Sequence, residues 1–342
     1  CSLGDAYDGR NAARFARLAH AVEMPGVDVD SLIHVHRMDG LVAFVIASIE
    51  SAAGEGSKLI AFGEALVPGY PAWLSRLDGA RFDDERNKSI HALYVDQAVD
   101  IGAGHLDGVR EACKAGGIAS VVGVAERAKD RGGHTLFCSA VTVAPTGDIA
   151  SVHRKLVPTY EERLAWSHGD AHGLVSHGFL PPFTLGSLNC WENWMPLTRA
   201  AMQAQGVDLH VAIWPGGDVN TLDITRFVAR ESRAYVLSAS SLMRAQDIPD
   251  ELPWKAELLA DDQTPDDGVL HNGGSAIAGP DGEWIVEPVI GDERTITVEI
   301  DHARVREERQ NFDPAGHYAR PELLSLSVDR RRQSAATFRD DG

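Results

Sequence analysis

A thiol, a carboxylate and an amine occupy comparable places in this sequence, and together they could carry out nucleophilic catalysis. Each directly follows an apolar run that predicts a strand: Glu64 after residues 58–62, Lys155 after 149–153 and Cys190 after 183–189. Strand ends of a layered α/β domain project side chains toward a common rim. The three residues are therefore candidates for one site.

Cys190 lies between its predicted strand and a predicted helix over residues 196–205. A thiol at such a junction can be accessible, and nearby cations or a helix N-terminus lower its pKa, so that a nucleophilic thiolate forms. The alternative is a buried structural cysteine, the commoner state of an unpaired cysteine. We keep that interpretation for Cys113, in a helical pattern, and for Cys138, inside a strand, and we assign no role to Cys1.

Glu64 and Lys155 each have a functional and an ordinary interpretation. Glu64 precedes a loop rich in proline and glycine, where partial burial would raise the carboxyl pKa toward that of a general base. The cation of Lys155 could stabilise developing negative charge. Taken singly, each residue is better explained by the ordinary interpretation, a plain loop carboxylate for Glu64 and a solvated basic stretch for Lys155.

Four segments carry a resemblance to a known family. They read FGEALVPGYP (62–71), RKLVPTYEER (154–163), CWENWMPLTR (190–199) and DPAGHYARPE (313–322). In this order they resemble the nitrilase branch of the carbon–nitrogen hydrolase superfamily, over about residues 45–330.

The resemblance implies a catalytic triad of Glu64, Lys155 and Cys190. It also implies that Glu162 is a second carboxylate that orients Lys155; Glu161 is the competing assignment, but Glu162 has the motif spacing. The implied reaction converts an organic nitrile to a carboxylic acid and ammonia through a thioimidate and a thioester on Cys190. It needs water and no metal or organic cofactor.

Three further residues near the nucleophile have predicted roles. Trp191 and Trp214 each follow a strand end and are candidates for the substrate-binding wall, with core packing as the alternative. Glu192 is predicted to be structural, paired with a cation or with backbone amides.

Short β-branched runs alternate with helical patterns, which predicts a layered α/β or α+β domain. The expected strands and helices include a helix over 42–53, a hairpin over 136–153 and a second hairpin over 275–289. The other expected strands cover 58–62, 118–124, 183–189, 209–214, 235–240 and 295–300. The hairpins make the sheets mixed, and the resemblance implies a four-layer α-β-β-α sandwich.

The domain organisation is read from the same patterns. We expect residues 1–40 to form a divergent N-terminal segment with an altered first strand, since 27–36 lacks the family's Val-x-Gln pattern. Residues 41–329 are predicted to form a single domain, in which the acidic stretch 245–271 is a surface excursion. Residues 330–342 are predicted to form a mobile tail.

Composition limits the class of partner. With 32 Lys+Arg against 50 Asp+Glu the net charge is −18, which disfavours binding to nucleic acid or to an anionic membrane. The spacing of the cysteines does not suggest disulfide pairs, which favours a cytoplasmic protein. No apolar run reaches the roughly 18 residues that a membrane-spanning helix needs. The resemblance implies a homodimer or a larger spiral homo-oligomer.

Other functions fit parts of the sequence. A metal-dependent hydrolase could use His34 and His36, or His168, His172 and His177, but no H-E-x-x-H occurs. A dinucleotide site at 102–108 lacks a preceding strand, and no G-x-S-x-G supports a serine hydrolase. A binding protein with a silent site, an amidase or carbamoyl amidohydrolase and a cyanide-degrading enzyme remain as alternatives to a nitrilase.

Overall fold

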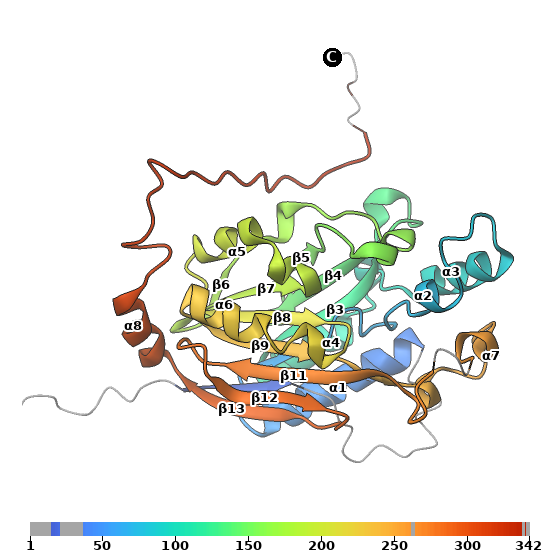
Figure 1. Ribbon diagram of the computed structural model, residues 1–342, viewed down its shortest axis with the longest axis horizontal. Helices are drawn as coiled ribbons and strands as arrows, with labels where there is room; N and C mark the ends of the chain where they lie inside the picture. Colours follow the sequence, from blue (N-terminus) through green and yellow to red (C-terminus); the bar gives the residue numbers. More distant parts are fainter. Residues whose placement is uncertain (1–14, 21–36, 261–263, 337–338, 340–342) are drawn as a thin grey trace, which may run out of the picture.

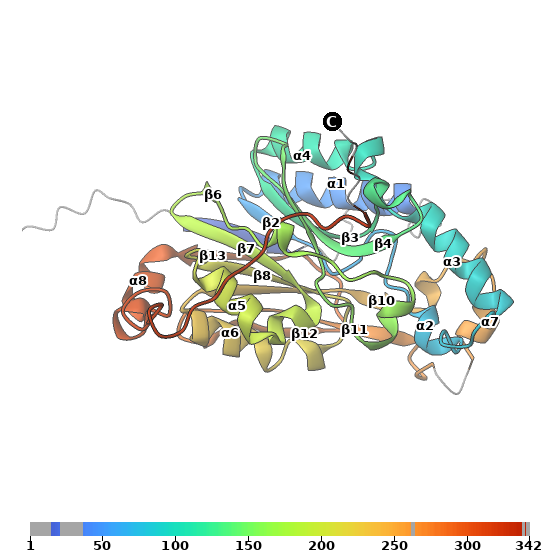
Figure 2. The same cartoon turned by 90° about the horizontal axis from the view of Figure 1, so that it is seen from above.

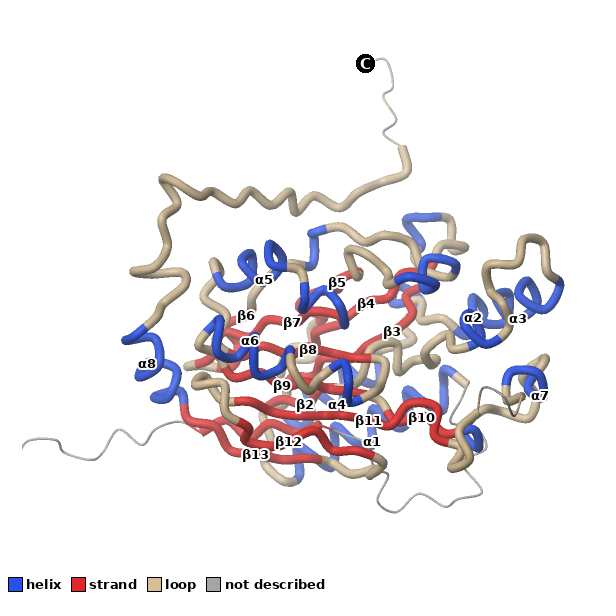
Figure 3. Tube along the Cα trace, in the orientation of Figure 1, coloured by secondary structure: helices blue, strands red, loops and turns tan. Residues whose placement is uncertain are grey.

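Two β-sheets pack face to face, and helices cover the outer face of each sheet (Figures 1 and 2). The computed structural model describes residues 15–20, 37–260, 264–336 and 339. Figure 3 shows the strands in the middle of the molecule and the helices around them. The predicted α-β-β-α sandwich is confirmed.

The first sheet has the strand order β13-β1-β2-β3-β4-β5. Its strands are β1 (Phe15–His20), β2 (Leu59–Ala61), β3 (Ala119–Arg127), β4 (Leu136–Val143), β5 (Ile149–Arg154) and β13 (Ile296–Asp301). β1, β2 and β3 run parallel, and β4 and β5 form the expected antiparallel hairpin. β1 was not expected, and the segment 27–36 lies outside the described residues.

The second sheet has the order β10-β11-β9-β8-β7-β6, and β12 also pairs with β11. Its strands are β6 (His177–Leu180), β7 (Phe183–Asn189), β8 (Leu209–Trp214), β9 (Tyr235–Ser240), β10 (Leu242–Arg244), β11 (Val269–Ala278) and β12 (Trp284–Ile290). β7, β8 and β9 run parallel, whereas β11 and β12 form the second expected hairpin. The short strands β6 and β10 were not expected.

Apolar spacing determines which helix faces are buried. Helix α1 (Met38–Gly54) turns Leu41, Val45, Ile49 and Ala52 inward, the three- and four-residue spacing of an amphipathic helix. With α4 (Asp107–Gly116) it packs on the outer face of the first sheet. Helices α5 (Pro196–Gln203) and α6 (Ile224–Ser232) cover the second sheet.

Further helices surround this sandwich. They are α2 (Trp73–Arg76), α3 (Glu85–Gln97), α7 (Lys255–Leu258), α8 (His302–Asn311) and the 3₁₀ helices η2 (Ile101–Ala103), η3 (Lys129–Arg131), η4 (Tyr160–Leu164), η5 (Ala171–Gly173), η6 (Cys190–Trp194), η7 (Asp218–Asn220) and η8 (Ala245–Asp247). The stretch 245–271 does leave the sheets, but it is more than a surface loop. Ile248 and Leu258 are buried against α2 and α3, and β11 already begins at Val269. None of the described helices has the length and apolarity needed to cross a membrane.

Gly123 in β3 lets the chain that carries Glu64 lie directly on the first sheet. A Cβ atom at this glycine would lie 2.1 Å from the carbonyl oxygen of Gly63 and 2.7 Å from the Cα atom of Glu64. The backbone N–H of Val67 donates to the carbonyl of Gly123 at 3.2 Å. Close backbone contact therefore sets the height of Glu64 above the sheet.

We expect Gly123→Ala to lower the free energy of unfolding by about 1–3 kcal/mol, the usual cost of overpacking, and to reduce activity because Glu64 is displaced. Urea unfolding and an activity assay would measure both effects. Gly178→Ala in β6 is the control, since no atom lies within 4 Å of its added Cβ. Equal stability of the two variants would contradict the expectation.

Candidate active site

Four buried side chains meet between the ends of strands from both sheets. The ammonium of Lys155 donates to Oε1 of Glu64 at 3.0 Å and to Oε2 of Glu162 at 2.7 Å. A carboxylate oxygen of Glu64, one of Glu162 and the sulfur of Cys190 all lie within 4.8 Å of one another. The structure thus brings together the four residues that the sequence analysis proposed as catalytic.

Glu64 is held by backbone contacts with the second sheet. It follows β2 after Phe62 and Gly63, and its N–H donates to the carbonyl of Trp214 at 3.0 Å. A Cβ on the preceding Gly63 would fall 2.0 Å from the hydroxyl of Ser241 and 3.0 Å from the same carbonyl. This close packing leaves the Glu64 carboxyl little freedom to move.

Lys155 directly follows β5, and its main chain is fixed on both sides. Its N–H donates to the carbonyl of Cys138 at 2.7 Å, and its own carbonyl accepts from Gly169 at 2.8 Å. The chain then turns through η4, which returns Glu162 to the ammonium, and Glu162 also accepts from the N–H of Thr159 at 2.6 Å. Glu161 on the same turn is partly exposed. This geometry favours Glu162 over Glu161 as the partner of Lys155.

Cys190 occupies a strained turn between β7 and η6. Its φ of 45° lies in the left-handed region, which costs a non-glycine residue about 1–3 kcal/mol. Its carbonyl accepts from the side chain of Asn193 at 2.8 Å. Such strain persists only where the surroundings impose it, and here it aims the thiol at Glu64 and Lys155.

Glu192 joins the turn of the nucleophile to the segment of the lysine. Its Oε2 accepts from the N–H of Asn189 at 2.9 Å, and its Oε1 accepts from the N–H of Leu156 at 2.6 Å. The imidazole Nε2 of His153 lies 2.9 Å from Oε2. Burial alone would raise the pKa of Glu192, but His153 and these amides outweigh burial and lower it. The predicted structural role of Glu192 is confirmed.

Burial controls the protonation of the site. It raises the pKa of Glu64 to about 8, against the opposing effect of Lys155, and raises the pKa of the Cys190 thiol well above its usual range. Burial by itself lowers the pKa of Lys155, but Cys190, Glu64 and the other acids around it raise the pKa well above its ordinary value. Burial therefore favours the neutral forms of Glu64 and of the thiol, whereas the surrounding acids favour the charged form of Lys155.

Tyr70 is a site residue that the sequence analysis did not identify. Its hydroxyl donates to Oε1 of Glu162 at 3.1 Å, and its ring packs edge-on against Trp166 and His271. Burial raises the pKa of Tyr70, so the hydroxyl stays a donor. Tyr70 lies in the same ten-residue motif as Glu64, and that position was the available signal.

The two candidate wall residues have different surroundings. Trp191 is half exposed beside the nucleophile. Trp214 is fully buried in the same apolar cluster as Cys190, and its indole N–H donates to the hydroxyl of Ser238 at 3.2 Å. The core-packing alternative thus describes Trp214, and contact of either residue with substrate stays a prediction.

The arrangement does not favour a metal centre. Within the described part of the chain, Glu64, Glu162 and Cys190 form the one group of three or more possible ligands close enough to share an ion. The ammonium of Lys155 already bonds both carboxylates and takes the place of a cation. His172 and His177 instead approach the carbonyl of Arg330 and the hydroxyl of Ser151, while His34 and His36 lie outside the described residues.

Comparison with known proteins agrees with this geometry. Residues 36–310 match the carbon-nitrogen hydrolase family. The chain belongs to this family. It is 32% identical over 290 residues to nitrilase 2 of Arabidopsis thaliana, covering 85% of this chain and 84% of that protein. It is also 32% identical over 304 residues to an aliphatic nitrilase of Sinorhizobium fredii, covering 88% and 94%.

Solved structures support the fold of this carbon–nitrogen hydrolase. A CN-hydrolase superfamily protein of Xanthomonas campestris matches with a TM-score of 0.62 at 17% identity, over 88% of this chain and 96% of that one. An amidase of Nesterenkonia from the nitrilase superfamily matches with a TM-score of 0.57 at 16% identity, over 86% and 94%. At these identities the likeness shows the shared sandwich.

Protonation of Glu64 makes the stability of the fold depend on pH. Between its ordinary pKa of 4.5 and its folded pKa of about 8, the folded state retains a proton that the unfolded chain releases. Rising pH therefore destabilises the fold through this residue. Glutamine does not titrate, so the Glu64→Gln variant lacks this loss of stability. We therefore expect its free energy of unfolding, relative to that of the native protein, to rise by a few kcal/mol in order of magnitude between pH 5 and 8.

Chemical denaturation at pH 5, 6.5 and 8 would measure this difference. Glu161→Gln is the matched control. Glu161 lies on η4 and its side chain is partly exposed, so the same chemical change is made outside the buried cluster. A stability difference for Glu64→Gln that stays constant with pH would contradict the assigned protonation.

Proposed function

We propose that this protein is a nitrilase, which hydrolyses an organic nitrile to the carboxylic acid and ammonia. The main support for this proposal is the buried cluster in which the Cys190 thiol, the Lys155 ammonium and the Glu64 and Glu162 carboxyls meet. Further support comes from relatives named nitrilases that match 85–88% of the chain.

The first chemical step forms a bond between sulfur and carbon. In its ionised form Glu64 takes the proton of the Cys190 thiol, and the thiolate attacks the nitrile carbon. The carbon–nitrogen triple bond becomes a double bond, and Glu64 passes the proton to the nitrogen, which gives a thioimidate. The ammonium of Lys155 stabilises the negative charge that develops on the nitrogen.

Two water molecules complete the reaction. Glu64 removes a proton from the first water as it adds to the thioimidate carbon, and the nitrogen leaves as ammonia once it is protonated. The resulting thioester on Cys190 is hydrolysed by the second water, which releases the acid and restores the thiol. Glu162 and the hydroxyl of Tyr70 keep the Lys155 ammonium in place throughout.

Amide release is the second candidate outcome. The tetrahedral species formed by the first water can expel ammonia or the Cys190 thiolate, and loss of the thiolate yields an amide. A relative of Oryza sativa subsp. japonica that is 34% identical over 299 residues, covering 85% of this chain and 80% of that protein, is named a bifunctional nitrilase/nitrile hydratase. Chromatography of the products would separate the two outcomes.

We base a proposal for the substrate class on a mostly apolar cavity that Tyr70 connects to the site. Its volume is about 420 Å³, and Trp73, Leu93, Met243 and Leu252 are among its walls. Tyr70 also lines it while donating to Glu162 of the site. We therefore propose that the nitrile carries an apolar substituent, such as an aromatic ring or a long alkyl chain, which this cavity receives.

We further propose that two copies of the chain associate through the helices beside the nucleophile. Large apolar side chains are exposed on η6, α5 and α6, namely Trp191, Trp194, Leu197 and Phe227. Exposed apolar groups gathered in this way are typical of a surface that another protein covers. This supports the homodimer that the family resemblance implies.

Cys190→Ala should abolish ammonia release from nitriles while the fold survives, because the variant lacks the nucleophile. Ammonia release and circular dichroism would test both parts. Cys113→Ala is the control, since this buried thiol lies in α4 away from the cluster. Full activity of Cys190→Ala would refute the proposed mechanism.

Filling the cavity should change substrate preference. We expect Leu252→Trp to lower kcat/KM for phenylacetonitrile about tenfold or more, because the substrate ring would lose the roughly 1.5–3 kcal/mol that its burial in the cavity contributes. The value of kcat/KM for acetonitrile, which has no such ring, should change by no more than about twofold. Leu324→Trp, on the exposed C-terminal segment, is the control. An equal loss for both nitriles would show that the cavity does not receive the substituent.

A further inference from the structure

The C-terminal segment returns to the body of the protein at one defined place. After α8 the chain crosses the molecule (Figure 1), and residues 320–331 are exposed along this path. Residues 330–333 then lie against η5, η3 and β5. The proposed mechanism does not use any of these contacts.

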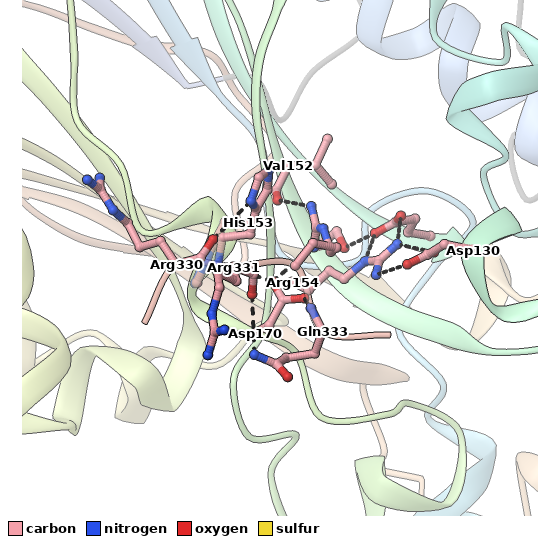
Figure 4. A network of polar contacts seen from close by, with 12 residues as sticks. Asp130, Val152, His153, Arg154, Asp170, Arg330, Arg331 and Gln333 are labelled. Carbon is pink, nitrogen blue, oxygen red and sulfur yellow. Dashed lines mark hydrogen bonds and ion pairs between the residues drawn. The ribbon is translucent and has the colours of Figure 1, made fainter. Parts of the chain in front are cut away.

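Asp170, at the start of η5, is the centre of this contact (Figure 4). Its Oδ1 accepts from the guanidinium of Arg332 at 3.1 Å, and its Oδ2 accepts from the backbone N–H of Gln333 at 3.0 Å. The guanidinium of Arg131 donates to the carbonyl of Gln333 at 2.6 Å, and Nδ1 of His172 lies 3.1 Å from the carbonyl of Arg330. Both backbone and side-chain groups thus hold the segment.

The contact lies next to the main chain of Lys155. Gly169, next to Asp170, donates its N–H to the carbonyl of Lys155 at 2.8 Å. The two backbones are so close that a Cβ on Gly169 would fall 2.2 Å from the carbonyl oxygen of Arg154. Arg332 also reaches the carbonyl of Val152, three residues before the lysine, at 3.4 Å.

Burial makes the link between Asp170 and Arg332 more than a surface ion pair. The Asp170 side chain is 4% exposed, whereas that of Arg332 is 29% exposed. Removing Arg332 leaves a buried carboxylate without its cation, which is far more disruptive than losing an exposed pair. The loop from Gly169 to His172 would have to rearrange, and with it the support of the Lys155 backbone.

We propose that Asp170 and Arg332 are positioning residues for Lys155, so that the docked C-terminal segment is part of the support of the active site. This inference rests on the proposed function, in which the Lys155 ammonium must meet the charge that develops at the reacting nitrogen. A displacement of about 1 Å at such a group can cost about a hundredfold in rate. The loss should appear in kcat, because the lysine acts on the transition state.

The test compares Arg332→Ala and Asp170→Asn with Arg331→Ala. Arg331 is the matched control, because its side chain is 85% exposed and pairs with Asp329 on the segment itself. We expect the first two variants to lower kcat for a nitrile ten- to a hundredfold, with KM within about twofold and with a lowered melting temperature but a native circular dichroism spectrum. Arg331→Ala should behave like the native protein, and Arg332→Lys should recover part of the lost rate.

A second readout separates this proposal from the proposed function. Alkylation of Cys190 by iodoacetamide, followed by peptide mass spectrometry, reports the support that Lys155 gives the thiolate without any nitrile. We expect Arg332→Ala to slow alkylation at pH 8 at least threefold, even if no nitrile proves to be a substrate. Unchanged alkylation, or an unchanged kcat in an active enzyme, would overturn the positioning role.

Oligomeric state is measured in the same samples by light scattering. A loss of kcat at unchanged oligomer size supports the proposal. A loss that follows dissociation and is reversed at high protein concentration would overturn it, because the segment would then act through association alone.

Discussion

A buried ammonium pairs with two buried carboxyl groups at the centre of the candidate site. The Lys155 side chain is completely inaccessible to solvent, and an isolated charge in such a place would be prohibitively costly. Glu64 and Glu162 make the burial possible, because both carboxyl groups accept hydrogen bonds from the ammonium. The same arrangement leaves a general base, a cation and a thiol within reach of one reacting carbon.

The cluster depends on the packing of one sheet against the other. Glu64 and Lys155 follow strands of the first sheet, whereas Cys190 follows β7 of the second. Hydrogen bonds cross between the two sheets at the site, from the N–H of Glu64 to the carbonyl of Trp214 and from the N–H of Leu156 to Glu192. A rigid apolar core between the sheets is therefore a condition for catalysis as well as for stability.

Strain and burial both act on the nucleophile. The left-handed backbone of Cys190 aims the thiol, while burial disfavours its ionised form. The thiolate is therefore expected to form as Glu64 accepts the proton during attack. Since water is excluded, the Lys155 charge acts at full strength on the developing anion. The roles proposed for the apolar cavity and for the C-terminal segment extend this organisation to the substrate and to the support of the lysine.

The layered fold, the two hairpins and the candidate residues Glu64, Lys155, Glu162 and Cys190 could all be predicted from the sequence. Alternating apolar patterns mark strands locally, and each of these residues lies in a short continuous motif, so neither inference needs distant contacts. The short strands β1, β6 and β10, the hydrogen bond from Tyr70 to Glu162 and the contact of Arg332 with Asp170 could not be predicted in this way. β6 is only four residues long and pairs with the neighbouring β7, so its pattern is too short to be recognised. The others join segments that are distant in the chain, by backbone pairing or by a single polar contact that leaves no periodic signal, and only the tertiary fold brings those segments together.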